Sequence, residues 1–182
     1  MNTITAHRYV SPSQRPLTHE EKEVRRLSYA LKIPTPEAVE LAAADLAPLV
    51  DAAEHPKTDI VLMPVPSSTG CIAANRQFAN ELAAELHRKY PTRRVTVRVT
   101  VGRMFPVESS CCRRKRGLPG LRAHEHAFIR VAGPLPFLST AYYFVDNVIT
   151  TGATLEACRA ALGFGDGIAF ADAGRTTTQG AA

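Results

Sequence analysis

Three short, unbroken apolar runs constrain the fold of this chain most. They read DIVLMPVP (residues 59–66), AYYFV (141–145) and GIAFADA (167–173). A strand that is buried on both faces loses the alternation of apolar and polar residues, as happens in parallel sheets. Helical patterns follow the first two runs, over residues 71–90 and 153–162. Strands that alternate with helices predict an α/β fold with a mostly parallel, Rossmann-like central sheet and flanking helices.

Two further strands are expected. RRVTVRVTVG (residues 93–102) alternates valine with polar residues, and HAFIRV (126–131) has a similar composition. The helix over 71–90 carries an apolar face, formed by Phe78, Leu82 and Leu86. Cys158 in the last helix is expected to belong to the core.

The N-terminal part predicts two more helices behind a flexible arm. Residues 1–17 show no periodicity and contain two prolines, so we expect an arm there. Thr18 and Glu21 form a capping box for a first helix, and Thr35 caps a second one. The apolar stripe of the second helix is expected to consist of Val39, Leu46 and Leu49.

Length and composition indicate one globular domain. The chain has 182 residues, of which 45% are hydrophobic and 21% charged. We expect N-terminal elements packed on the core (1–57), the main domain (58–172) and a mobile tail (173–182). No apolar run reaches the roughly 18 residues of a membrane span, and no secretory signal is evident. The four cysteines form no CxxC pair, so a reducing, cytoplasmic location is expected.

The segment YYFVDNVITTGATL (142–155) carries the clearest chemical signal. In a parallel sheet, residues that follow a strand lie at the ligand-binding edge, so Asp146 and Asn147 are expected there. Residues 150–154 precede a helix, where backbone N–H groups and the helix dipole favour an anion. A carboxylate accepts hydrogen bonds from sugar hydroxyls. The chemistry favours a sugar phosphate; the alternative is a capped turn that binds nothing.

This segment resembles the PRPP-binding motif of type I phosphoribosyltransferases, in which four hydrophobic residues precede two acids and a Thr/Gly loop. PRPP is 5-phosphoribosyl 1-diphosphate. The resemblance implies catalytic positions at Asp146 and Asn147, which would hold the ribose hydroxyls. It implies that the 5-phosphate is bound by Thr150, Thr151, Gly152, Ala153 and Thr154. Asn147 departs from the usual second acid and supplies no negative charge to the reacting centre.

The resemblance also implies a site for the pyrophosphate group. The loop after the first core strand would bind it through Pro66, Ser67, Ser68 and Thr69, together with Arg103 beyond the next strand. Residues 104–125 would form a flexible catalytic loop whose basic side chains are Arg113, Arg114, Lys115 and Arg116. The alternatives are an ordinary connection for the first loop, a surface role for Arg103, and a solvated charge run or nucleic-acid patch for the basic residues.

Within this family the chain is most similar to the ComF-type branch. PVPSS is followed by NRQFANELAAEL and by a basic loop ahead of HAFIRV. The zinc module that commonly precedes the domain in that branch is not matched by the first 57 residues. The resemblance covers residues 58–172.

The expected function is a phosphoribosyltransferase of nucleotide metabolism. It would transfer the 5-phosphoribosyl group of PRPP to a small-molecule acceptor, which we expect to be a nitrogenous base. The reaction would use Mg²⁺, held mainly through PRPP and by Asp146. The alternative is a regulator that senses PRPP or nucleotides without catalysis, or that binds nucleic acid. Nucleic-acid binding is supported by the segment 93–122, which has nine basic residues in a chain of net charge +5. The resemblance also makes a homodimer an expectation.

Overall fold

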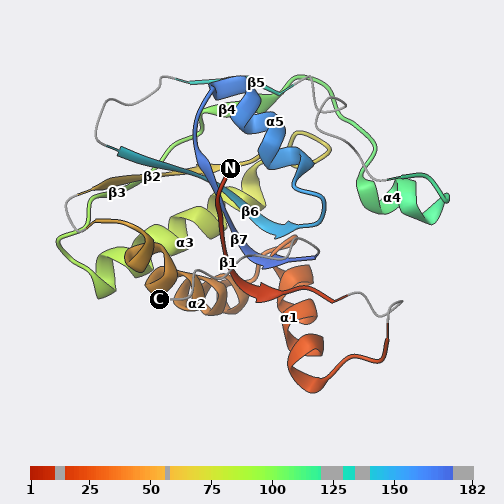
Figure 1. Cartoon of the computed structure of the whole chain (residues 1–182), viewed down its shortest axis with the longest axis horizontal. Helices are drawn as coiled ribbons and strands as arrows, with labels where there is room; N and C mark the ends of the chain where they lie inside the picture. Colours follow the sequence, from red (N-terminus) through yellow and green to blue (C-terminus); the bar gives the residue numbers. More distant parts are fainter. Residues whose placement is uncertain (11–14, 56–57, 120–128, 134–139, 174–182) are drawn as a thin grey trace.

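The computed structural model describes residues 1–10, 15–55, 58–119, 129–133 and 140–173 (Figure 1). Its centre is a sheet of five parallel strands, which confirms the expected α/β architecture. The strand order is β1 (Thr3–Arg8), β7 (Asp166–Asp172), β6 (Thr140–Ile149), β2 (Asp59–Pro64) and β3 (Val95–Val97). A separate antiparallel pair is formed by β4 (Val101–Arg103) and β5 (Ile129–Val131).

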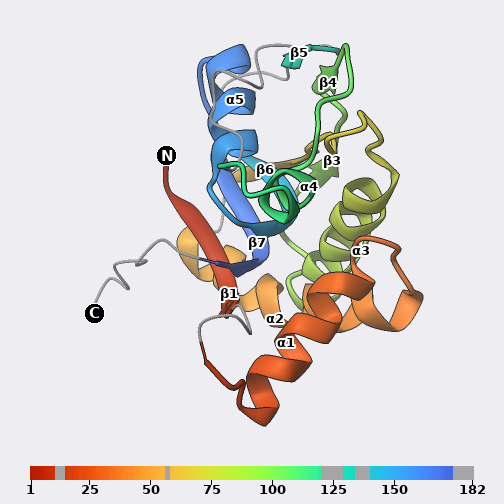
Figure 2. The ribbon, with the colours of Figure 1, turned by 90° about the vertical axis from the view of Figure 1, so that its right-hand side faces the viewer.

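Helices cover both faces of the parallel sheet. The helices are α1 (His19–Ala30), α2 (Pro36–Ala53), α3 (Ala73–Lys89), α4 (Ser110–Lys115) and α5 (Ala153–Leu162). Figures 1 and 2 show α2 and α3 on one face and α5 on the other. Among the described residues, none of these helices combines the length and the apolar character needed to cross a membrane.

Neighbouring residues of the central strands enter different core layers. In β2, Ile60 and Leu62 pack toward α2 and α3, whereas Val61 and Met63 pack toward α5. All four are nearly inaccessible to water. Because both faces of the strand are covered, every position of β2 after Asp59 is apolar, which is why the sequence run is unbroken. Each such side chain contributes about 1.5–3 kcal/mol by its burial.

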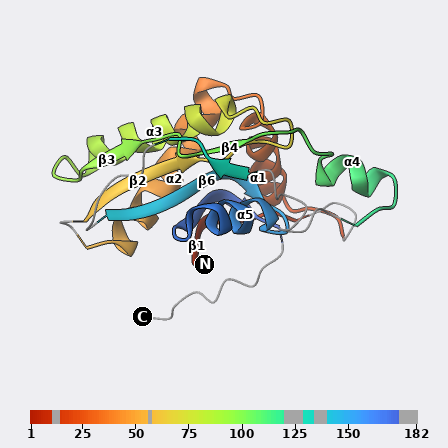
Figure 3. The ribbon, with the colours of Figure 1, turned by 90° about the horizontal axis from the view of Figure 1, so that it is seen from above.

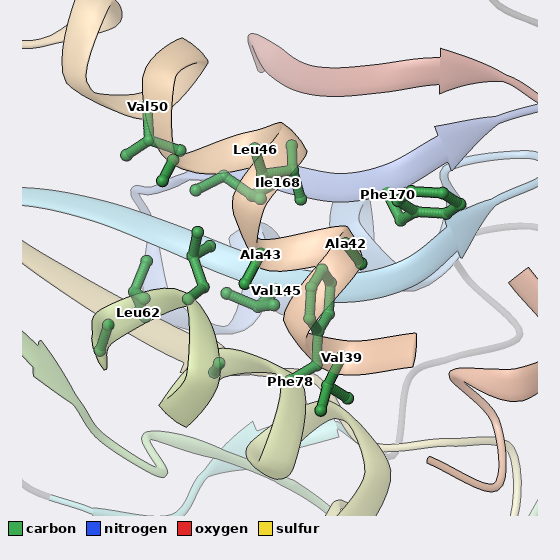
Figure 4. Close-up of a cluster of buried hydrophobic side chains, with 14 of the residues drawn as sticks. Val39, Ala42, Ala43, Leu46, Val50, Leu62, Phe78, Val145, Ile168 and Phe170 are labelled. Atoms are coloured by element: carbon green, nitrogen blue, oxygen red, sulfur yellow. The ribbon is translucent and has the colours of Figure 1, made fainter. Parts of the chain in front are cut away.

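The layer between the sheet and helices α2 and α3 is the larger one. Figure 4 shows α2 and α3 side chains packed against Leu62, Val145, Ile168 and Phe170. The predicted α3 face of Phe78, Leu82 and Leu86 is confirmed, since all three are fully buried.

The predicted stripe on α2 is wrong at one position. Val39 and Leu46 are buried, but Leu49 is 41% exposed. The buried stripe instead ends at Val50 and includes four alanines, Ala38, Ala42, Ala43 and Ala47. Those small side chains take part in the buried face, so a pattern based on large residues located it incompletely.

The N-terminal arm is a second correction. Residues Thr3–Arg8 form β1, an edge strand paired in parallel with β7. The Tyr9 N–H continues the contact by donating to the Asp172 carbonyl at 2.7 Å. An edge strand needs only one partner and stays half-buried, so its mixed composition hid it. The helix caps were predicted correctly: Thr18 and Glu21 exchange both bonds of a capping box, and Thr35 caps α2.

The segment 93–102 is two strands rather than one. β3 belongs to the parallel sheet, and β4 pairs with β5 outside it. After Val97 the chain leaves the sheet, and the Thr100 carbonyl accepts from the Ala132 N–H at 2.8 Å instead. The alternating valines suit both strands equally, so periodicity gave no sign of the break. Residues 126–128 of the HAFIRV strand and 174–182 of the expected tail lie outside the described part.

Candidate functional site

Asp146 lies where β6 separates from β2. The sequence predicted that the strand ends at Asp146, but β6 continues to Ile149. Its pairing with β2 stops at Val145, opposite Pro64, whereas its pairing with β7 continues to Asp172. Relative to β2, Asp146 therefore lies at the C-terminal edge of the sheet, where ligands bind in parallel sheets. Relative to β7, it still lies within the paired part of the strand.

Asn75 holds the Asp146 carboxylate and was missed by the sequence analysis. Its Nδ2 donates to Asp146 Oδ1 at 3.2 Å and to the Val65 carbonyl at 3.0 Å. Asn75 is only 7% exposed. It precedes Phe78 by three residues, on the buried face of α3. A polar residue on an apolar helical face was the available signal.

The surroundings of Asp146 disfavour its charge. Burial raises the pKa of Asp146 to about 6, although hydrogen bonds from the Asn147 N–H and Asn75 and the charge of Lys32 act in the opposite direction. The Asn147 N–H donates to Asp146 Oδ1 at 2.8 Å. Carboxyl groups with raised pKa values concentrate at functional sites, because folding alone does not favour them.

The loop before α5 has the predicted form. Gly152 is the N-cap residue, with a φ of +75° that an L side chain rarely adopts. The Ala153 N–H donates to Thr151 Oγ1 at 3.3 Å. A cavity of about 40 Å³ joins this loop to Asp146, and its lining includes Thr150, Thr151, Gly152, Ala153 and Thr154. The cavity is too small for a whole sugar phosphate, so only one end of such a ligand would enter it.

The loop after β2 lies beside Arg103. Arg103 Nε donates to the Ser67 carbonyl at 2.9 Å, so β4, whose last residue is Arg103, brings this guanidinium to the loop. The Ser67 and Thr69 hydroxyls are 2.9 Å apart and exposed, and Ser68 is half-buried. Pro66 is buried and offers no side chain to a ligand. Helix α3 begins only at Ala73, beyond the loop.

Two of the basic residues after Arg103 contact their own segment. Part of that segment is helix α4, an element that the sequence analysis did not assign. Arg113 Nε donates to the Pro119 carbonyl at 2.8 Å, and Arg116 pairs with Glu108 at 3.2 Å. Lys115 is exposed, while the side chain of Arg114 lies outside the described part. In Figures 1 and 3, α4 lies at one end of the molecule, away from the sheet.

Arg93 does not belong to a basic surface. It is 3% exposed and donates to Asp51 Oδ1 at 2.8 Å. It also donates to the backbone carbonyls of Asp51, Glu54 and His55. Its guanidinium thus satisfies the C-terminal end of α2, which removes Arg93 from the nucleic-acid patch considered above. Arg122, at the end of that patch, lies outside the described residues.

In the described ranges, no group of three or more His, Cys, Asp or Glu residues is placed to hold a metal ion. Cys158 is buried in the core as predicted, and Cys71 and Cys112 are exposed. Any ion at the candidate site would therefore rest on Asp146 and on oxygen atoms of a ligand.

Comparison with known proteins gives no family. No protein-family model matches the chain, and no curated protein matches it either. The structure defines an α/β protein with a five-stranded parallel sheet, compatible with a Rossmann-like fold.

Proposed function

We propose that this protein binds PRPP at the C-terminal edge of its parallel sheet and acts as a type I phosphoribosyltransferase. The proposal rests on the two hydrogen bonds of the Asn75 side chain, to the Val65 carbonyl and to Asp146. Asn75 links Val65, which leads into the loop 66–70, to Asp146, which leads into the loop 150–154. The loop at the N-terminus of α5 and the hydroxyl-bearing loop 66–70 thus share one edge, with a carboxylate between them.

Each part of PRPP has a matching group in this arrangement. The 5-phosphate would lie against Thr150–Thr154, where the N-terminus of α5 favours negative charge. The ribose hydroxyls would donate to Asp146. The pyrophosphate would meet the hydroxyls of Ser67 and Thr69, with Arg103 beside the same loop.

The residues present suit Mg²⁺ that arrives with PRPP. Mg²⁺ commonly binds one or two carboxylates together with substrate phosphates, and Asp146 is the carboxylate available here. The ion would supply charge neutralisation for the pyrophosphate and the ribose oxygens. The composition of the site therefore agrees with a metal that enters with the substrate.

The proposed reaction relies on positioning and charge. As the bond between C1 and pyrophosphate breaks, its electron pair leaves with pyrophosphate and C1 becomes positive. A nitrogen atom of the acceptor then donates an electron pair to C1. Asp146 orients the ribose and favours positive charge on it, while Arg103 stabilises the leaving group. The acceptor belongs to the class of nitrogenous bases.

Binding without transfer is the second candidate, and Asn147 favours it. Asn147 Oδ1 accepts from the Val148 N–H at 2.8 Å, so the amide oxygen engages its own backbone. The position also lacks a second negative charge. A sensor of PRPP or nucleotides needs affinity but no stabilised cation, and this site meets that requirement.

Calorimetric titration with PRPP and Mg²⁺ tests the proposed site. We expect saturable binding that Asp146→Ala removes and that Asp59→Ala preserves, because Asp59 starts β2 at the opposite edge. Absence of saturable binding to the folded protein would refute the site.

Pyrophosphate release in the presence of a panel of bases separates the two candidates. Release that depends on one base would support transfer. PRPP binding without release, together with a gain of release in Asn147→Asp, would identify a binding protein whose site is not adapted for turnover.

A further inference from the structure

A second hollow lies at the other end of β6, away from Asp146. Figure 1 shows β6 crossing the molecule, so its two ends lie on opposite sides. The hollow has a volume of about 390 Å³, within the usual range of small-ligand sites. β6 starts at Thr140, but its pairing with β7 begins only at Tyr143 opposite Asp166, which leaves a notch in the sheet. The lining residues are Glu54, Thr140, Ala141, Tyr142, Tyr143, Phe164, Gly165 and Asp166.

One side of the hollow is aromatic. The rings of Tyr142 and Phe164 lie 4.7 Å apart between centroids and are tilted by 58°. Gly165 has a φ of +102°, and a Cβ there would come within 2.7 Å of Phe144 Cε2. The backbone therefore runs close to the core at this point, and only glycine fits between Phe164 and Asp166.

The charged groups that line the hollow are acidic. Glu54, at the end of α2, accepts a hydrogen bond from the Tyr143 hydroxyl. Burial raises the pKa of Tyr143, which keeps that hydroxyl a donor. Asp166 Oδ1 accepts from the Asn2 N–H at 2.8 Å and lies 3.4 Å from Arg159 Nη1.

Two arginines outside the lining approach these carboxylates, and one of them, Arg159, forms an ion pair with Asp166 at 3.4 Å. None of the residues given above as its lining is basic. The other arginine, Arg93, donates to the backbone carbonyl of Glu54, but its side chain is buried and its charge is paired with Asp51. In a chain of net charge +5, an acidic hollow with an aromatic side selects for cations.

We propose that this hollow is a binding site for a small organic cation with a flat, apolar body, such as an aryl amidine or an aryl guanidine. The cationic group lies between Glu54 and Asp166 and donates to their oxygen atoms. The flat body lies on Tyr142 and Phe164, where ring faces attract cations and apolar surface. A bare metal ion suits the site less, because the aromatic side provides no ligand.

Benzamidine is the probe, with neutral benzamide and anionic benzoate as matched comparators in calorimetric titrations. We expect saturable binding of benzamidine and an affinity for benzamide at least about ten times lower, because benzamide cannot form a charged hydrogen bond with either carboxylate. Benzoate should not bind. Equal affinity for benzamide, or no saturable binding of benzamidine by the folded protein, would overturn the proposal.

Three variants locate the site. Glu54→Gln and Asp166→Asn keep the shape of each side chain and should each weaken benzamidine about tenfold, by loss of one charged acceptor. Asp59→Asn removes a carboxylate from the same edge of the sheet but outside the hollow, and should leave the affinity unchanged. An equal loss in Asp59→Asn would mean that benzamidine responds to overall charge, and the site would be rejected. Circular dichroism checks that each variant is folded.

Discussion

Replacing Asp146 with asparagine should make the protein more stable at neutral pH. The raised pKa means that the folded protein binds a proton at Asp146 more tightly than the unfolded chain does. The pKa moves from 3.8 to about 6. Each pKa unit corresponds to about 1.4 kcal/mol, so the charged carboxylate costs about 3 kcal/mol of folding free energy above pH 6.

The pH dependence gives the prediction its sign. Between about pH 4 and pH 6 the folded state holds more protons, so wild-type stability falls as the pH rises through that window. Asparagine is neutral throughout, and its amide oxygen can still accept from the Asn147 N–H and from Asn75. Asp146→Asn should therefore be about 3 kcal/mol more stable than wild type at pH 7.5 and equally stable at pH 4.

Urea unfolding followed by circular dichroism measures the difference. In a domain of this size, about 3 kcal/mol also raises the melting temperature by roughly 6–12 °C. Asp59→Asn is the control, since it removes one negative charge from the neighbouring strand. A variant that is no more stable than wild type at pH 7.5, or whose gain is the same at pH 4, would refute the reasoning.

Three other substitutions test the site and its support. Arg93→Met should lower the free energy of unfolding by about 3 kcal/mol in urea titrations, because it removes the ion pair with Asp51 and the hydrogen bonds to the carbonyls of Asp51, Glu54 and His55. Asn75→Ala should raise the pKa of Asp146 further, as measured by carboxyl carbon NMR, because a hydrogen bond to the charged form is lost. Gly152→Ala should cost about 1–2 kcal/mol in a thermal melt, because its φ is +75°.

For each of these three predictions, one result would contradict it. Arg94 is exposed beside Arg93, so Arg94→Met should leave stability unchanged, and an equal loss would exclude the specific role of Arg93. An unaltered Asp146 pKa in Asn75→Ala would mean that the amide does not support the charge. A Gly152→Ala protein as stable as wild type would show that the loop relaxes out of its left-handed conformation.

The sequence predicted the inner strands well because both faces of each are covered. β2 and β7 consist almost wholly of buried residues, so their composition alone identified them. β1 is half-exposed and was assigned to an arm, since its partner β7 lies at the far end of the sequence. The division of 93–102 into β3 and β4 also depends on distant partners that local periodicity does not contain.

At the candidate site, the local parts were predictable and the long-range parts were not. The loop before α5 follows from one glycine and the start of a helix. The hydrogen bond from Asn75 to Asp146 joins residues 71 positions apart, and the sequence around either residue does not indicate it. Arg93 was assigned to a charged surface, because a sequence does not reveal that the end of α2 needs a donor.

The placement of β1 has a consequence for how the chain is made. Asn2 contacts Asp166 across 164 residues, and every bond of β1 to the sheet involves β7. During synthesis β1 is made well before β7 and cannot pair with the sheet until β7 has left the ribosome. A product truncated before β7 would therefore expose the edge of β6 that β7 covers, with β1 still unpaired.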